Sequence, residues 1–182
     1  PPTAGDGGSV LSLEGGALRV PSEIYELPDG PFTLEAWVNP DTTDGSQGVV
    51  AKTQSSEFAL FLHDGVPDFS VHLGDRYSVA KAGEKLESDR WFHLAGVYSG
   101  EEVLLFIDGR PVARAPGSGE RTRNDLPVYL GGDPGDDGQL TRPFDGQLDE
   151  VRLSRGARYR ETFRPQRRLE PDGDTVLHYD FD

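Results

Sequence analysis

The stretch that decides the fold is WFHLAGVY at residues 91–98, followed by VLLFIDGRPVARA at residues 103–115. The first run is aromatic and apolar on both faces, which is typical of a strand covered on both sides. The second run consists of two β-rich segments that meet at Asp108-Gly109, a dipeptide that favours a two-residue hairpin turn. Together the two runs predict an all-β protein.

Short strand-like runs continue along the whole chain, separated by glycine, proline and aspartate, and almost no stretch carries a helical period. Turn chemistry recurs at residues 28–30, 64–65, 108–109 and 131–138, and one short helical turn is expected around 155–162. So many strands require two packed sheets, a two-sheet antiparallel β-sandwich. The predicted strands are 10–13, 17–20, 32–39, 48–53, 57–63, 68–73, 77–81, 91–98, 103–107, 111–115, 128–131, 146–154 and 175–181.

The composition suits one domain over residues 1–182, because a chain of this length can bury a substantial core. The absence of cysteine excludes disulfides and zinc–thiolate sites. The formal charge of −14 repels phosphate backbones, so we expect no nucleic-acid partner. The longest apolar runs, 58–62 and 103–107, are far shorter than the roughly 20 residues that cross a bilayer, so we expect no membrane insertion. A chain without methionine also suggests an excised piece of a larger protein.

Several motifs occur in an order that points to a known family. FTLEAWV at 32–38 precedes WFHLAGVY and the hairpin, and FDGQLDEVRLSRGAR at 144–158 follows them. In this pattern and order, over most of its length, the chain resembles the laminin-G-like jelly rolls of the concanavalin A-like lectin/glucanase superfamily. The resemblance implies a jelly-roll sandwich. It does not decide among lectins, adhesion modules and enzymes, since this fold carries all three.

Side chains in the run 32–39 alternate between two faces. The outward face carries Glu35 and Trp37, which could offer a sugar hydrogen-bond acceptors and a stacking surface. We therefore name Trp37 and Glu35 as candidate ligand-binding residues on the outside of a sheet. The alternative is that Trp37 packs under a loop and Glu35 pairs with an arginine. The opposite, core-facing set is Phe32, Leu34, Ala36 and Val38.

Asp149 alternates in phase with Val151 and Leu153, so it faces the core if they do. A buried carboxylate costs several kcal/mol unless donors, a cation or protonation compensate it. The resemblance implies a structural calcium ion at the rim of the sandwich, with Asp149 as first candidate ligand and Glu14 and Asp180 as candidate neighbours. Alternatively, Asp149 only ties down loop amides.

A second candidate for calcium is the loop 133–138, which reads DPGDDG. It does not fit an EF-hand, because an alignment that starts at Asp133 puts glycine at position 3 and phenylalanine at position 12. A looser site that uses Asp133, Asp136 or Asp137 is one alternative, and a solvated loop is the other.

The sequence carries no catalytic signature, and we predict no catalytic residues. Laminarinase-type hydrolases of the resembled superfamily carry two glutamates that bracket an aspartate on one strand, and that pattern is absent. There is no Gly-x-Ser-x-Gly elbow and no phosphate loop, and the four histidines are scattered singly. A glycosidase with carboxylates on different strands stays open as an alternative.

These observations predict a noncatalytic binding or accessory module with a glycan or protein ligand and a structural calcium ion. We expect it to act beside neighbouring domains of a larger bacterial protein that is extracellular, bound to the cell surface or periplasmic. One alternative is a structural spacer or adhesion domain without a ligand of its own, and the other is the glycosidase.

Overall fold

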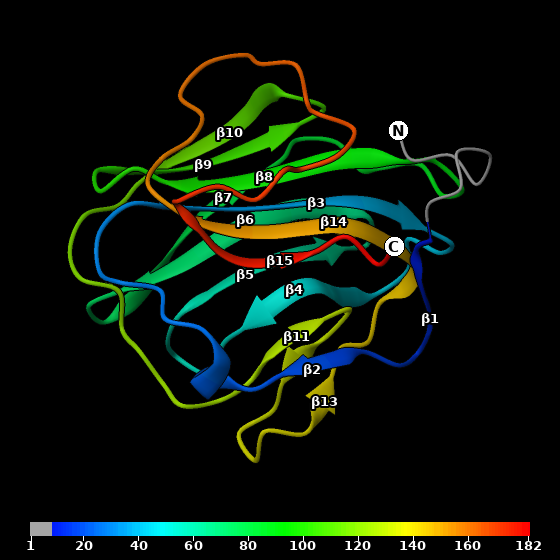
Figure 1. The fold of residues 1–182 in the computed structure, drawn as a ribbon, viewed down its shortest axis with the longest axis horizontal. Helices are drawn as coiled ribbons and strands as arrows, with labels where there is room; N and C mark the ends of the chain where they lie inside the picture. Colours follow the sequence, from blue (N-terminus) through cyan, green and yellow to red (C-terminus); the bar gives the residue numbers. More distant parts are fainter. Residues whose placement is uncertain (1–8) are drawn as a thin grey trace.

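The computed structural model describes residues 9–182, and its architecture is two antiparallel sheets packed face to face (Figure 1). The seven-stranded sheet has the order β1-β14-β3-β8-β9-β10, with β15 also paired to β14. The six-stranded sheet has the order β2-β11-β4-β5-β6-β7, and β12 and β13 form a small separate ribbon. The predicted antiparallel β-sandwich is confirmed.

The strands of the seven-stranded sheet are β1 (Leu11–Glu14), β3 (Phe32–Pro40), β8 (Phe92–Tyr98), β9 (Glu102–Ile107), β10 (Arg110–Pro116), β14 (Asp145–Arg155) and β15 (Thr175–Tyr179). Those of the six-stranded sheet are β2 (Leu18–Val20), β4 (Ser46–Lys52), β5 (Phe58–His63), β6 (Val66–Leu73), β7 (Arg76–Lys81) and β11 (Val128–Leu130). The remaining elements are β12 (Asp133–Pro134), β13 (Leu140–Thr141) and the 3-10 turn η1 (Ser22–Ile24).

Every predicted strand is present, with ends that agree within two residues. The sequence did not indicate η1 or the short pair β12 and β13. The helical turn expected around 155–162 is wrong, because that segment is irregular. Within residues 9–182 no helix is long and apolar enough to span a membrane.

Two of the predicted turns set the register of their hairpins. Asp64 and Gly65 join β5 to β6 with φ angles of 50° and 78°, and Asp108 and Gly109 join β9 to β10 with φ angles of 49° and 75°. A two-residue turn with positive φ at both positions has the twist that antiparallel strands require, and Asp-Gly adopts it at little cost. Each turn therefore fixes the register of the residues beside it, and in the second hairpin a bulge between Pro111 and Ala113 shifts the register farther along β10.

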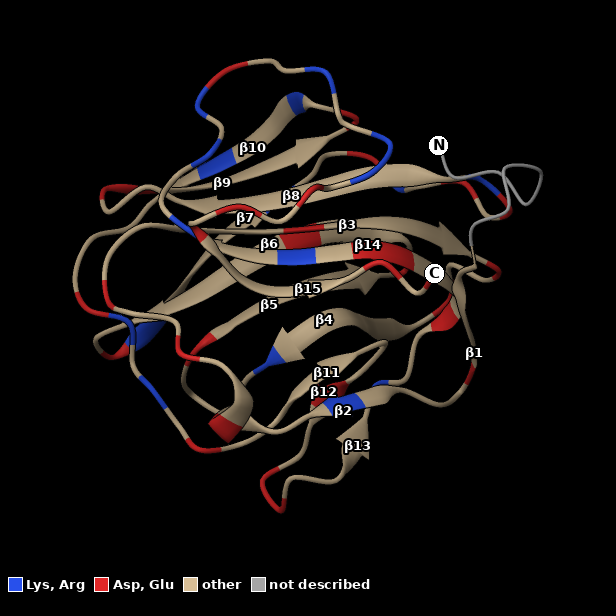
Figure 2. Ribbon diagram, in the orientation of Figure 1, with Lys and Arg blue, Asp and Glu red and all other residues tan. Residues whose placement is uncertain are grey.

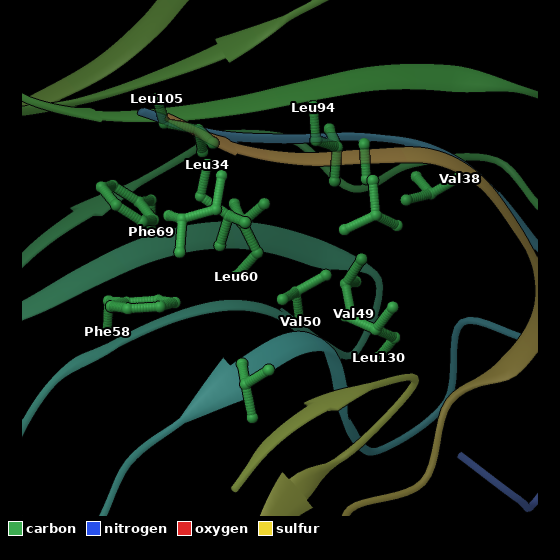
Figure 3. Close-up of a cluster of buried hydrophobic side chains, with 14 of the residues drawn as sticks. Leu34, Val38, Val49, Val50, Phe58, Leu60, Phe69, Leu94, Leu105 and Leu130 are labelled. Atoms are coloured by element: carbon green, nitrogen blue, oxygen red, sulfur yellow. The ribbon is translucent and has the colours of Figure 1, made fainter. Parts of the chain in front are cut away.

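The core lies between the two sheets, where apolar side chains from both inner faces meet (Figure 3). Leu34 and Leu105 of the seven-stranded sheet pack opposite Leu60 and Phe69 of the six-stranded sheet. Gly96 on β8 leaves room for the ring of Phe69, because a Cβ at this position would collide with that ring. The core is apolar, so the polar chemistry of the molecule lies on the two outer faces and at the rim.

A bulge in β14 changes which residues face the core. Asp149 pairs with Trp37, but the next pairing joins Arg152 to Glu35, and the residue after Asp149, Glu150, has φ of 51°. An extra residue in one strand shifts the alternation by one position. The prediction that Asp149 points into the core in phase with Val151 is therefore wrong: Asp149 shares the outer face with Trp37, and its neighbour Leu148 is the core residue.

Candidate functional site

The outer face of the seven-stranded sheet is covered by the strap, our name for residues 156–173 between β14 and β15 (Figure 1). In the strap Tyr159 and Phe163 stack ring on ring with 3.5 Å between centroids, and both rings contact Phe106 of β9. The backbone N–H of Phe163 donates to the carbonyl oxygen of Gly109 at 2.9 Å. The strap is thus packed against this face as a small second core.

Under the strap, the Glu35 carboxylate is fully buried, and both of its oxygens have polar partners. It accepts hydrogen bonds from Arg152 at 2.7 and 3.0 Å and from the Tyr159 hydroxyl at 2.9 Å, and His93 Nε2 lies 3.1 Å away. Burial alone would raise the pKa of Glu35, but the hydrogen bonds and charges of His93 and Arg152 outweigh burial and hold that pKa below its usual value. This carboxylate is therefore an internal counter-ion.

Trp37 lies beside this network and is only 6% exposed. Its indole Nε1–H donates to the carbonyl oxygen of Gln166 in the strap at 3.0 Å, and its ring meets that of His93 edge to face. Both predicted ligand-binding residues thus lie beneath the strap, which is the alternative arrangement, with Trp37 packed under a loop and Glu35 paired with an arginine. Ligand binding by Trp37 and Glu35 stays a prediction, and it requires that the strap first move away.

The three predicted calcium ligands are not brought together as one set. Asp180 lies near enough to Asp149 to raise its pKa, whereas Glu14 lies across from Asp145 on the neighbouring strand. Burial, followed by the nearby charges of Glu150 and of the chain end, raises the pKa of Asp149 to about 7. Among residues 9–182, no group of three or more histidine, aspartate or glutamate side chains is arranged to hold a metal ion. The predicted set therefore does not fit a metal centre in this geometry.

The loop 133–138 does not leave its first aspartate available either. Asp133 is buried, accepts a hydrogen bond from the Thr53 hydroxyl at 2.6 Å and pairs with Arg142 at 3.1 Å. Burial raises the pKa of Asp133, and its two partners offset part of that effect. The side chain acts as a bridge that fixes Arg142 and the end of β4, and Asp136 and Asp137 lie in the exposed part of the loop.

The outer face of the six-stranded sheet, in contrast, carries an open groove of about 320 Å³. Its floor is low at Ser70 of β6, which lies in one row with the fully buried Ala51 of β4 and Ala59 of β5. Longer side chains form the walls. The lining residues are Thr53, Gln54, Ser55, Phe61, His63, Asp68, Ser70, Tyr77, Val79 and Arg142.

Asp68 is the acidic residue that lines the groove, and it is 4% exposed. Its Oδ2 lies 3.1 Å from His63 Nε2, and burial raises its pKa although the charges of His63 and Lys81 lower it. A carboxylate accepts hydrogen bonds and donates none, so its free lone pairs suit the hydroxyl groups of a polyol. Asp68 with His63 thus provides a polar anchor at the wall.

An aromatic and cationic wall stands next to Asp68. The Phe61 and His63 rings lie 5.4 Å apart, and the Arg142 guanidinium lies over the Phe61 ring at 5.4 Å. The Arg142 side chain is half-exposed while its Nη1 is held by Asp133, so its orientation is fixed and its other donors remain accessible. Flat rings with adjacent donors are the components that bind sugars in proteins.

Another part of the lining is a loop held in an uncommon backbone conformation. Gln54, Ser55 and Glu57 have φ angles of 82°, 52° and 55°, a region that residues other than glycine rarely adopt. Tyr77 helps to fix the loop, since its hydroxyl donates to the carbonyl oxygen of Ser56 at 2.8 Å. Such conformations persist only where the surroundings impose them, and they cluster at functional sites. The loop supports the groove as the candidate functional site.

The groove lies on the other sheet from Trp37 and Glu35, and a signal for it was present in the sequence. In β5 the core residues Phe58, Leu60 and Leu62 alternate with Ala59, Phe61 and His63. In β6 the same alternation places Asp68 and Ser70 outward. What the pattern could not supply is that the strap covers the other outer face and leaves this one open.

Besides a cavity of about 310 Å³ beside Arg76, Ser78 and Pro116, two further cavities lie elsewhere on the molecule. The larger, about 760 Å³, lies between the loop 82–90 and the β9–β10 hairpin, and acidic and basic side chains are mixed in its lining. The other, about 270 Å³, lies beside Lys52, Glu57 and Arg121. Lys52 and Arg121 both pair with Glu57, and burial lowers the pKa of Lys52 to about 8 and that of Arg121 to about 10. The smaller cavity thus borders an internal ion cluster.

Comparison with protein families gives one match, to the Concanavalin A-like lectin/glucanases superfamily, over residues 13–162. The sequence matches no curated protein.

Solved structures with the same fold share little sequence with this chain. A protein from Bacteroides ovatus ATCC 8483, provisionally described as carbohydrate binding, superposes with a TM-score of 0.69 at 18% identity, over 95% of this chain. This chain spans 48% of that protein, about half its length. The carbohydrate-binding module CBM40 of a Ruminococcus gnavus sialidase gives 0.63 at 15% identity, over 82% of this chain and 90% of the module. Domain 4 of AbnA, an extracellular arabinanase from Geobacillus stearothermophilus solved with arabinotriose, gives 0.62 at 20% identity, over 85% and 74%.

Proposed function

The chain belongs to the Concanavalin A-like lectin/glucanases superfamily, and from that premise we propose that it is a noncatalytic carbohydrate-binding module. The observation that carries the proposal is the groove on the outer face of the six-stranded sheet. It combines a low floor with aromatic, acidic and basic walls. Its volume of about 320 Å³ is at the lower end of the range for small-ligand sites, which suits one or two sugar rings.

The lining favours a neutral glycan as the ligand of this groove. Asp68 would accept hydrogen bonds from ring hydroxyls, while Arg142 and the amide of Gln54 would donate to ring or hydroxyl oxygens. His63 would lie against an apolar face of a ring, and Phe61, which is 6% exposed beneath the Arg142 guanidinium, would support that wall from behind. A free sugar acid would have to approach the partly desolvated Asp68 carboxylate, which is unfavourable.

The absence of a second carboxylate in the described lining favours binding over hydrolysis. Glycosidases use two carboxyl groups on either side of the bond that they cleave. Among the described residues that line the groove, Asp68 is the acidic one, and the Asp133 carboxylate behind the wall is occupied by Thr53 and Arg142. We therefore assign the groove to binding and keep the glycosidase as the less favoured alternative.

The module would act as part of a larger protein outside the cytoplasm. Similar solved domains include a sialidase module and a domain of an extracellular arabinanase, each joined to a catalytic protein. In such a protein a glycan-binding module would hold a neighbouring domain close to its polysaccharide, which raises the effective concentration of the substrate.

Calcium also remains part of the proposal, in a reduced form. The charge of Asp180 helps to raise the pKa of Asp149, which supports these two as the ligands, whereas Glu14 lies across from Asp145. An ion that binds only the folded state stabilises that state. If Asp149 is a calcium ligand, the thermal unfolding midpoint of the wild type should be higher with calcium than with chelator. Asp149→Asn should lose that difference. Equal midpoints for the wild-type protein would remove calcium from the account.

The experiment that tests the groove is a glycan array followed by calorimetry with the best neutral oligosaccharide. We expect Asp68→Asn to weaken binding about tenfold or more, because a charged acceptor is worth roughly 1.5–3 kcal/mol in a hydrogen bond. Asp136→Asn, an exposed aspartate of the 133–138 loop, is the matched control and should bind as the wild type does.

A protein that binds no glycan on the array would favour the spacer, the second candidate. Equal binding by wild type and Asp68→Asn would place the site elsewhere, and release of a product from the oligosaccharide would revive the glycosidase.

A further inference from the structure

The positive charge of this acidic protein is concentrated in one short segment. Residues 155–168, the last residue of β14 and most of the strap, contain six arginines and one glutamate. This segment therefore carries a formal charge of +5, two units of which are paired with Asp172 and Asp182, and the rest of the chain carries −19. Charge segregation of this size produces a local field of opposite sign to the field of the whole molecule.

Several of these arginines point into solvent without a partner. Arg155, Arg160 and Arg164 are exposed, and their side chains form no hydrogen bond or ion pair with another described residue. Arg110, at the start of β10, is also exposed and lies next to the strap, because Phe163 of the strap bonds to Gly109. Figure 2 shows the corresponding blue segments along the strap and on β10.

Other arginines of the segment hold the strap in place. Arg158 forms two hydrogen bonds with Asp172, at 2.6 and 2.9 Å, and Arg168 pairs with Asp182 at 2.8 Å. The strap's aromatic side chains, Tyr159 and Phe163, face the sheet. The strap is therefore a fixed ridge that presents guanidinium groups outward and keeps its aromatic rings inside.

We propose that the strap and the adjoining start of β10 bind an anionic polysaccharide that carries carboxylate or sulfate groups. A guanidinium donates a pair of parallel hydrogen bonds to such groups. Cations spaced four or five residues apart along an extended segment suit a linear polymer better than a compact ligand. The surface lies on the opposite side of the sandwich from the groove, so this proposal does not depend on the groove.

Two properties of the surface favour a polysaccharide over nucleic acid. Single-stranded nucleic acids bind by stacking their bases on exposed aromatic rings, and the rings of the strap are turned inward. Duplex DNA carries a charge every 1.7 Å or so, which the acidic remainder of the molecule repels more strongly than it repels a sparsely charged polymer. At physiological salt the Debye length is about 8 Å, so the local positive charge governs contacts at the strap.

Binding to polygalacturonate and to chondroitin sulfate, with uncharged dextran as a control, tests the proposal. The variant is the double substitution Arg160→Gln and Arg164→Gln. The matched control removes two exposed arginines from the six-stranded sheet, Arg19→Gln and Arg76→Gln, so that the net charge is the same. We expect the wild type to bind at least one of the two charged polymers and not dextran, and added salt to weaken binding.

The strap variant should bind about tenfold or more weakly, since each charge near an anionic surface contributes about 1 kcal/mol, and the control variant should remain within about twofold of wild type. Equal losses in both double variants would overturn the proposal, because net charge alone would then explain binding. Tighter binding to a DNA oligomer than to either polymer would also overturn it, as would failure of both polymers to bind. Unfolding midpoints of both variants identify any loss that comes from misfolding.

Discussion

The two outer faces of the sandwich start from the same kind of sequence and end with different roles. Both alternate acidic, aromatic and small polar residues with core residues, around Glu35 on β3 and around Asp68 on β6. The strap covers the first face and turns Glu35 into a buried counter-ion, whereas the second face stays open as a groove. A pattern of residues on a strand thus describes what a face could bind, and the rest of the chain decides whether that face is accessible.

The largest effect that separates the two faces should come from Glu35→Ala. Removing this carboxylate leaves the Arg152 guanidinium buried without its partner, which should cost roughly 3–5 kcal/mol of stability. Urea unfolding measures this loss in the free energy of unfolding. Asp68→Asn is the control, and we expect it to lose less than about 1 kcal/mol. Similar losses in the two variants would contradict the distinction between a buried network and an open groove.

A smaller effect should follow from weakening the strap itself. Phe163→Ala removes a ring that packs on Phe106 and Tyr159, and we expect a loss of about 2–3 kcal/mol. Because the strap also shields Trp37, the tryptophan emission should shift to longer wavelength in the folded variant. Ile24→Ala, at an exposed apolar residue far from the strap, is the control. Unchanged emission and stability in Phe163→Ala would mean that the strap does not seal this face.

The smallest of these effects should come from Asp149, at the edge of the covered face. Its pKa is about 7 in the folded protein and near 3.8 when unfolded, so between these values the folded state holds a proton that the unfolded state releases. Stability is therefore lost as the pH rises from about 4 to 7. Asp149→Asn does not titrate, and we expect it to be more stable than wild type by about 1 kcal/mol at pH 8, allowing for partial solvent screening, and equally stable at pH 4.

Thermal unfolding of the two proteins across this pH range measures the difference. A gap that is the same at pH 4 and pH 8 would show that the effect comes from packing and not from the proton.

The sequence could predict the strands and the hairpins because those signals are local. The alternation in 32–39 and the Asp-Gly turns at 64–65 and 108–109 depend on neighbouring residues only, and both were confirmed. The bulge at Glu150 was not predictable from the alternation. A single residue in a left-handed conformation shifts the alternation, so that the side chains before it point to the opposite face from the one expected.

The position of the strap was equally hidden from the sequence. Residues 156–173 form no regular element, and their place depends on long-range contacts such as the pairing of Tyr159 with Glu35 and of Gln166 with Trp37. Since the strap decides which outer face is open, the candidate site moved from Trp37 and Glu35 to the groove around Asp68. The family resemblance, carried by short motifs spread along most of the chain, was confirmed.

The measurement that tests the account most directly is amide hydrogen–deuterium exchange with and without the best neutral oligosaccharide from the array. If the groove is the binding site, exchange should slow in β5, β6 and β7 and in the loop 53–57, and it should not change in the strap. Faster exchange in the strap, with protection around Trp37 and no change in β5 to β7, would contradict the account and return the site to the covered face.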